Sequence, residues 1–586
     1  MSVMKYQKHV LGLTIGLVLS GATYAADNTA SITQTVDATA QNALVVQTGN
    51  SNDATVSQAG DGTALSNETA IYVTGDNNTT DTSQTGSNQQ AFTTVEGNDN
   101  TIGVTQAGPN NQSFINAQGN ANSIAVNQHQ LSPSSAVELS AIAVDGDNNN
   151  VSVAQENRPD WTNSQGVTTH YSASNQAFVD ISGKNNTVDA FQQGAAANTT
   201  AVAITGKDNS VVSDQRAGRN GAFADIGGNG NELALKQNGW DLTTANTITA
   251  DDNTVSVTQR GHNQEAYTNL SGNDNNLSVN QVDSAKPWAY GDNFSMMEVS
   301  GEKNALTTTQ HQDGNTAIMN IHSDGDKNTI TVTQENNNLA YFDVSDKQNV
   351  IEVTQNDENS AVLNVSGEQN ELTVDQVNSN STYFDVSGDK NVVDLQQNNT
   401  NAAEFFISGR ANDLIDVDQV EGESHSSMTI SGDQNQIALY QTSNDESVMD
   451  VAGNKNSLNV TQGDGAQTAL LQVGGSRNEL SLTQQDGSNL TWADVGGDQN
   501  DISVAQTGDI NLVAMLLSAD ADKNTISMTQ TGNGNSAGLW SEGTNGTVTF
   551  SQNGTSNVAG GYQASTGNTM TITQDGSANV ALVYQN

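Results

Sequence analysis

The heptad NTITVTQ at residues 328–334 returns as NVIEVTQ at 349–355, NELTVDQ at 370–376 and NVVDLQQ at 391–397. The glutamines that end these heptads lie 21 residues apart. The same frame extends outward from this stretch, back to residue 28 and forward to residue 574. We count about 24 copies, most of them 21 to 24 residues long. A period of this size is typical of solenoid proteins, in which each repeat forms one coil.

Each copy has two halves, and both alternate apolar and polar residues. The first half follows Asn-x-Φ-x-Φ-x-Gln, where Φ is apolar, and the second follows Asn-x-Ala-x-Φ-x-Φ-x-Gly, as at residues 359–367. A period of two predicts strands with one buried face. Two such strands bring their apolar faces together across a turn, and the next copy stacks on them about 4.7–4.8 Å away. The predicted fold class is all-β: a two-strand-per-coil β-solenoid of about 24 stacked repeats, of the cross-β type.

In the first half, the Asn and Gln fall on the same alternate positions as the buried apolar residues, so their side chains should point to the same face of the strand. A buried amide costs free energy unless it is hydrogen-bonded, and in a stack the amides above and below are natural partners. We therefore expect Asn and Gln ladders along the stacking axis. The alternative, that these residues only form turns, suits Asn but does not explain a Gln at nearly every strand end. The expected ladder residues are Asn328, Gln334, Asn349, Gln355, Asn370, Gln376, Asn391, Gln397, Asn435, Gln441, Asn456 and Gln462.

Residues 1–25 differ from the rest and are predicted to be a secretory signal peptide. Lys5 and Lys8 precede an apolar run at 10–19, and small residues follow up to Ala25. We place the cleavage after Ala25, with Ala26 as the alternative. The run is too short to span a membrane, and no other stretch approaches about 18 apolar residues. The chain is therefore expected not to be transmembrane, with a solenoid over residues 26–586. It has no cysteine, so disulfides do not stabilise it.

Loop insertions interrupt the regular spacing near residues 129–148, 156–182 and 282–298. All four prolines follow a repeat Gln, at the turn between half-repeats, and none falls within an expected strand. Trp161 and Trp288 lie in two of the insertions. These outer loops are candidate binding sites; the alternative is that they are tolerated extensions at the corners of the coils.

The chain is strongly acidic, with 18 Lys and Arg against 65 Asp and Glu and a net charge of -47. Such a charge argues against nucleic acid as a partner. Outward strand positions carry acids such as Glu352, Asp375, Asp394 and Asp416. One interpretation is that these acids maintain solubility and delay aggregation; the other is that they bind calcium or basic partners. We expect assembly to be faster at low pH or with divalent cations.

No pattern in the sequence indicates catalysis. The seven histidines are scattered, and there is no nucleophile elbow, metal-spaced cluster or phosphate-binding loop. We therefore predict no catalytic residues, no metal site and no cofactor.

The repeat resembles the curlin repeat, the unit of the curli family of bacterial extracellular amyloid fibres. The resemblance rests on the order Asn, Gln, Asn, Ala and an apolar residue, as in Asn304, Gln310, Asn315, Ala317 and Met319. It covers nearly the whole chain after the signal peptide. The chain departs from the family in three ways: it has several times the usual number of repeats, its second half ends in Gly-x-x-Asn rather than Gln, and it lacks a Gly-rich leader.

The resemblance implies a secreted structural subunit of extracellular, curli-like fibres that serve biofilm matrix and surface adhesion on a Gram-negative bacterium. It also implies a nucleator subunit and a dedicated outer-membrane export system as partners. Both ends of the solenoid have strand-like sequence, at residue 28 and at 579–586, so we expect uncapped edges that add further copies end to end. The alternative is a monomeric cell-surface β-solenoid adhesin or spacer.

Overall fold

The computed structural model describes most of the chain after residue 26. The described residues are 27–35, 41–60, 65–131, 136–157, 161–162, 168–169, 174–194, 196–283, 292–323, 325–366, 368–383, 385–404, 406–408, 410, 415–442 and 444–586. The chain divides into unit 1, residues 1–293, and unit 2, residues 294–586. The predicted signal peptide lies outside the described residues.

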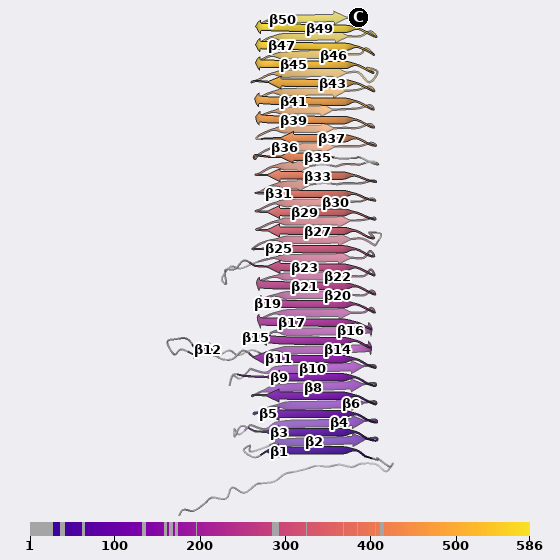
Figure 1. Cartoon of the computed structure of the whole chain (residues 1–586), viewed down its shortest axis with the longest axis vertical. Helices are drawn as coiled ribbons and strands as arrows, with labels where there is room; N and C mark the ends of the chain where they lie inside the picture. The colour runs from indigo at the N-terminus through magenta and orange to yellow at the C-terminus, as the bar shows by residue number, and fades with distance from the viewer. Residues whose placement is uncertain are drawn as a thin grey trace, which may run out of the picture. The chain divides into compact units, whose positions relative to one another are not determined.

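Each unit consists of two parallel β-sheets, whose strands alternate along the chain (Figure 1). We call the sheet of first-half strands sheet A and the sheet of second-half strands sheet B. In unit 1, sheet A contains β1 (Thr29–Thr35), β3 (Asp53–Ala59), β5 (Thr79–Thr85), β7 (Thr101–Ala107), β9 (Ser123–His129), β11 (Asn150–Asn157), β15 (Thr187–Gly194), β17 (Ser210–Gly218), β19 (Glu232–Trp240), β21 (Thr254–His262) and β23 (Asn276–Val282). Sheet B of unit 1 contains β2 (Gln41–Thr48), β4 (Asn67–Thr74), β6 (Gln90–Glu96), β8 (Asn111–Gln118), β10 (Glu138–Asp145), β14 (Gln176–Lys184), β16 (Thr199–Lys207), β18 (Gly221–Ile226), β20 (Thr243–Ile248) and β22 (Glu265–Leu270).

Unit 2 repeats this arrangement. Its sheet A contains β25 (Ala305–His311), β27 (Thr329–Glu335), β29 (Val350–Asn356), β31 (Glu371–Val377), β33 (Val392–Asn398), β35 (Ile415–Gln419), β37 (Gln436–Gln441), β39 (Ser457–Gly465), β41 (Glu479–Gly487), β43 (Asp501–Thr507), β45 (Thr525–Asn533), β47 (Thr547–Thr555) and β49 (Thr569–Ser577). Its sheet B contains β24 (Phe294–Val299), β26 (Thr316–Ile321), β28 (Leu339–Val344), β30 (Ser360–Val365), β32 (Ser381–Tyr383), β34 (Ala402–Glu404), β36 (His425–Thr429), β38 (Glu446–Asp450), β40 (Thr468–Gln472), β42 (Leu490–Val495), β44 (Leu512–Leu517), β46 (Ser536–Ser541), β48 (Val558–Gln563) and β50 (Val580–Gln585).

Consecutive coils pair in parallel, with equivalent residues in register. Between β27 and β29, Ile330 pairs with Ile351 and Gln334 with Gln355. Counted over the two units, each type of sheet has 24 strands. The all-β two-strand coil and the count of about 24 repeats are thereby confirmed.

The core of each coil is thin and comes from both sheets. In β29, Ile351 and Val353 are buried while Glu352 between them is exposed. In β30, Ala361, Leu363 and Val365 are all fully buried. The alternation follows from strand geometry, because successive side chains point to opposite faces.

Both turns of the coil place one residue in the left-handed region directly before a buried Asn. Lys327 has φ 61° before Asn328, and Asn337 has φ 51° before Asn338. Glycine is required where turns of neighbouring coils stack closely. A Cβ added to Gly453 (φ 97°) would lie 1.8 Å from the carbonyl oxygen of Gly475 in the next coil. The recurrent turn glycines therefore permit the close stacking of coils.

The turn residue Ile510 provides a stability prediction. It has φ 57° and is 66% exposed, a costly conformation for a β-branched residue. Asn occupies the same turn position in other coils, and Asn tolerates this conformation well. We expect Ile510→Asn to stabilise the neighbouring coils by about 1 kcal/mol, measured by hydrogen exchange of β43 and β44. The control Leu512→Asn removes another exposed apolar side chain at a position without positive φ, and should give no gain.

The three loop insertions are shorter than the ranges expected from the sequence, because strands of sheet B begin within those ranges. The range 129–148 contains the whole of β10, which begins at Glu138; the other two ranges contain the start of β14, at Gln176, and of β24, at Phe294. Within the second insertion, β12 (Trp161–Thr162) pairs antiparallel with β13 (Thr168–Thr169). Pro109 lies at the turn after β7, and the other three prolines lie outside the described residues.

Candidate functional site

The most regular polar feature of the molecule is a row of buried glutamines in sheet A. Gln334 Nε2 donates to Gln355 Oε1 at 2.9 Å, and Gln355 Nε2 donates to Gln376 Oε1 at 2.9 Å. Gln376 donates in the same way to Gln397 at 2.8 Å, and the row continues through Gln441 and Gln462. Every bond has the same direction, from an amide nitrogen to the amide oxygen of the next coil.

Each glutamine also links the two sheets. Gln355 Nε2 donates a second hydrogen bond to the carbonyl oxygen of Leu339, in β28, at 3.0 Å. Its amide therefore makes three hydrogen bonds, although only 1% of the residue is exposed. A fully bonded amide can occupy the core without the usual cost of burying a polar group.

The first-half asparagines form a second row, with the opposite direction. Asn349 donates from its backbone N (2.8 Å) and Nδ2 (3.0 Å) to Asn328 Oδ1, in the preceding coil. Asn370 Nδ2 donates to Asn349 Oδ1 at 3.0 Å. The Asn391 backbone N donates to Asn370 Oδ1 at 3.4 Å. This row is therefore antiparallel in polarity to the glutamine row.

The same row continues further along unit 2. The backbone N of Asn456 donates to Asn435 Oδ1 at 3.0 Å. Between these segments, the position equivalent to Asn391 in the next coil is Asp413, which lies outside the described residues. All twelve expected ladder residues are buried, and each belongs to one of the two rows.

A third row, in the second-half turn, was missed by the sequence analysis. Asn338 Nδ2 donates to Asn315 Oδ1 at 3.1 Å, Asn359 to Asn338 at 3.1 Å, and Asn380 to Asn359 at 3.0 Å. The signal was present, because the second-half pattern also begins with Asn. Two acids replace an amide in this row: Glu138 in unit 1 and Asp445 in unit 2.

Some of the outward acids of sheet A lie close together on neighbouring strands. Asp394 pairs in register with Asp416. Partial burial raises the pKa of Asp394, and the nearby carboxylates of Asp416 and Asp375 raise it further. Among the described residues, no group of three or more His, Cys, Asp or Glu is placed to hold a metal ion. The described part of the chain also contains no helix long and apolar enough to span a membrane.

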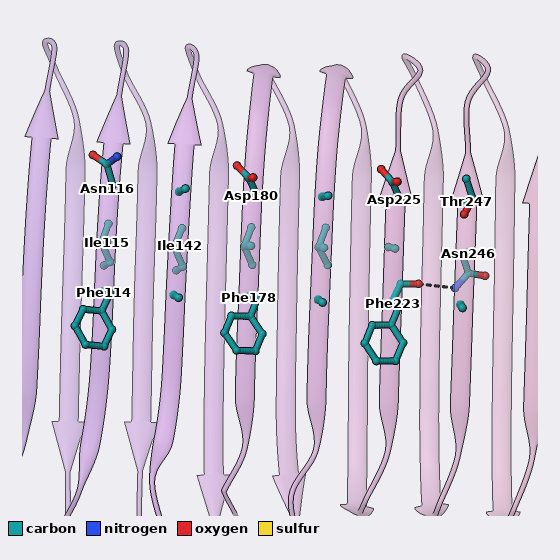
Figure 2. Close-up of a pocket in the computed structure, with 18 of the residues that line it drawn as sticks. Phe114, Ile115, Asn116, Ile142, Phe178, Asp180, Phe223, Asp225, Asn246 and Thr247 are labelled. Carbon is teal, nitrogen blue, oxygen red and sulfur yellow. Dashed lines mark hydrogen bonds between the residues drawn. The ribbon is translucent and has the colours of Figure 1, made fainter.

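The side chains of the two tryptophans in the expected binding loops lie outside the described residues. Trp161 begins β12, but its side chain lies outside the described residues, as does the whole of Trp288. The groove that the structure does show was not anticipated. It lies on the outer face of sheet B in unit 1, has a volume of about 780 Å³, and is lined by phenylalanines and alanines (Figure 2).

One family comparison bears on this repeated architecture. A family model described as the curlin associated repeat matches residues 25–60, 75–108 and 250–282. No curated protein matches the chain. Each matched segment begins before one sheet A strand, passes through a sheet B strand and ends at the next sheet A strand, for example from β5 through β6 to β7. The matched unit is thus one two-strand coil plus the next strand, and the three matches support a curlin-repeat protein.

Proposed function

We propose that this chain is a secreted, non-enzymatic subunit that polymerises end to end into extracellular, amyloid-like fibres of a bacterial biofilm matrix. The supporting observation is the complementarity of the two surfaces of a coil. Each coil presents glutamine Nε2 donors to one neighbour and Oε1 acceptors to the other, in one strand register. A coil of a second copy can therefore stack by the same contacts that join coils within a unit.

The proposal places the fibre on the surface of a Gram-negative bacterium, where it serves adhesion. A nucleator subunit and an outer-membrane export system are further parts of it. Electron microscopy of the purified chain distinguishes the proposal from the monomeric adhesin or spacer. Long, unbranched, thioflavin-positive fibres support end-to-end growth, whereas discrete rods contradict it.

A pair of variants in β50 tests whether growth is end to end. Val583 points to the inner face and is half-buried, whereas Leu582 points outward and is 77% exposed. An added coil would cover Val583, so Val583→Lys would bury a charge in the joint. We expect this variant to stop elongation from preformed fibre seeds, measured by thioflavin fluorescence. Leu582→Lys places the same charge outside the joint and should elongate normally; equal elongation of both variants would contradict the proposal.

A further inference from the structure

The outer face of sheet B in unit 1 carries a row in which phenylalanine and alanine alternate from coil to coil. Neighbours in the row pair in register across six strands, β8, β10, β14, β16, β18 and β20. Over these six strands the row reads Phe114, Ala141, Phe178, Ala201, Phe223 and Ala245, and it continues with Phe92 in β6 and Tyr267 in β22. The three phenylalanines of the six strands, labelled in Figure 2, are the ridges of the groove. The strand register places the alanines between them, and we call these positions the floor of the groove.

These phenylalanines are exposed although the fold does not require it. Phe114, Phe178 and Phe223 are 39%, 38% and 42% exposed. On the three strands that carry the phenylalanines, the other outward positions hold polar or charged residues apart from Gly221, for example Asn116 and Asp180. A contiguous apolar groove bordered by polar and acidic outward positions indicates a contact site.

The alternation makes the face complementary to itself. A two-fold axis parallel to the strands, midway between β14 and β16, would place a second copy face to face with the stacking direction reversed. Within the six strands every ridge then meets a floor position of the other copy, and one strand further out Phe92 of one copy meets Tyr267 of the other. The opposed pairs are Phe114 with Ala245, Ala141 with Phe223, and Phe178 with Ala201.

The neighbouring outward row obeys the same symmetry. The same axis places Asn116 opposite Thr247, Ala143 opposite Asp225, and Asp180 opposite Ala203. Each carboxylate therefore meets an alanine and not another carboxylate, and the polar ends of the row meet each other. Carboxylates of the two copies still lie one coil apart, about 5 Å along the stack, so their repulsion is weakened by salt.

We infer that this face of unit 1 binds the same face of a second copy of the chain, side by side and antiparallel. The face consists of six strands about 4.8 Å apart and about 20 Å long, so the contact would cover about 600 Å² of each copy, or about 1,200 Å² in all. That area is at the lower end of specific interfaces. The contact is isologous and closes as a pair, so it is distinct from end-to-end growth.

The absence of cysteine from the chain allows a direct test. We would prepare Asn116→Cys and Thr247→Cys separately in the full chain, mix them in high salt, and add a short bis-maleimide. The antiparallel face places these two positions opposite each other, so a covalent heterodimer should form only in the mixture. In each single variant the two thiols would be five strands apart, about 24 Å, and should not cross-link. Homodimers without heterodimer, or no cross-link, would overturn the inference.

A second variant pair checks that the phenylalanines drive the contact. Phe178→Asp should sediment as a single chain in high salt. Val212→Asp changes a side chain of comparable exposure, 42%, on the outer face of sheet A, and should still pair. Pairing of both variants would contradict the inference. Carrying out these measurements in the Val583→Lys background separates side-by-side pairing from end-to-end growth, since each contact can then fail alone.

Discussion

Replacing Gln355 with glutamate is expected to open the coils around β29, whereas replacing its exposed neighbour Thr354 with glutamate leaves them folded. A carboxylate at position 355 cannot donate to Gln376 Oε1 or to the Leu339 carbonyl oxygen, which Gln355 bonds at 2.9 and 3.0 Å. It also places an uncompensated charge at a site that is 1% exposed. Loss of these bonds and burial of the charge should cost about 3–5 kcal/mol or more.

Hydrogen exchange resolved by peptide measures this effect, because the coils of a solenoid stabilise mainly their nearest neighbours. Protection should fall in β27, β29 and β31, and remain unchanged in distant coils. Below the usual pKa of a carboxyl group the protonated Glu can donate one hydrogen bond, so the loss should shrink in acid. Equal protection of the Gln355→Glu and Thr354→Glu variants would show that the glutamine row contributes little to stability.

The strands and coils could be predicted because each depends on local spacing. The alternation in NTITVTQ assigns Ile330 and Val332 to one face, and the recurrence of the heptad brings equivalent residues together in the next coil. Gln334 lies two residues after Val332, so the same alternation predicted that its side chain points inward. No relation between distant segments was needed, since every coil carries the same pattern.

The remaining features depend on three-dimensional register, which the sequence analysis did not trace through the insertions. The direction of each amide row is visible only in the structure: Gln355 donates to the next coil, whereas Asn349 donates to the preceding one. Ala141 and Phe178 become neighbours only when the insertion between them is looped out. The Phe and Ala alternation is therefore hidden in the linear sequence, where these residues are separated by unequal distances.

Glu138→Gln is expected to stabilise unit 1 by up to about 5 kcal/mol above pH 8, and to remove a loss of stability that the unmodified chain shows between pH 4.5 and about 8. Glu138 is 0% exposed and pairs in register with Asn111, in the second-half amide row. Burial raises the pKa of Glu138 from 4.5 to about 8, opposed in part by hydrogen bonding with Asn175. A folded chain therefore holds a neutral Glu138 at neutral pH.

The amide row gives an independent reason for the proton. Among the described residues, Asn111 Oδ1 and Glu138 Oε2 are both buried without a hydrogen-bond partner. In unit 2 the equivalent oxygen, Asn338 Oδ1, accepts from Asn359 Nδ2 at 3.1 Å. A protonated Glu138 has a hydroxyl to donate where the row needs a donor, whereas a carboxylate has none. Asp445, in the same row of unit 2, is affected similarly: burial raises its pKa from 3.8 to about 7, although its carboxylate accepts from the backbone N of Gln467 and Thr442 at 3.0 Å.

The sign of the pH dependence follows from which state holds the proton. Below pH 4.5 Glu138 is protonated in the folded and unfolded chain, and its titration costs nothing. As the pH rises to about 8, the unfolded chain releases the proton and the folded chain keeps it, so stability falls by about 1.4 kcal/mol per pH unit.

Denaturant unfolding of unit 1, followed across this range, should show this fall in stability with pH in the unmodified chain and not in Glu138→Gln. Glutamine fits the row, since Gln264 occupies the equivalent position in β22's coil. The control Glu96→Gln removes the same charge from an exposed position at the end of β6 and should keep the slope; a slope that survives in Glu138→Gln as well would show that the buried carboxyl is not its source.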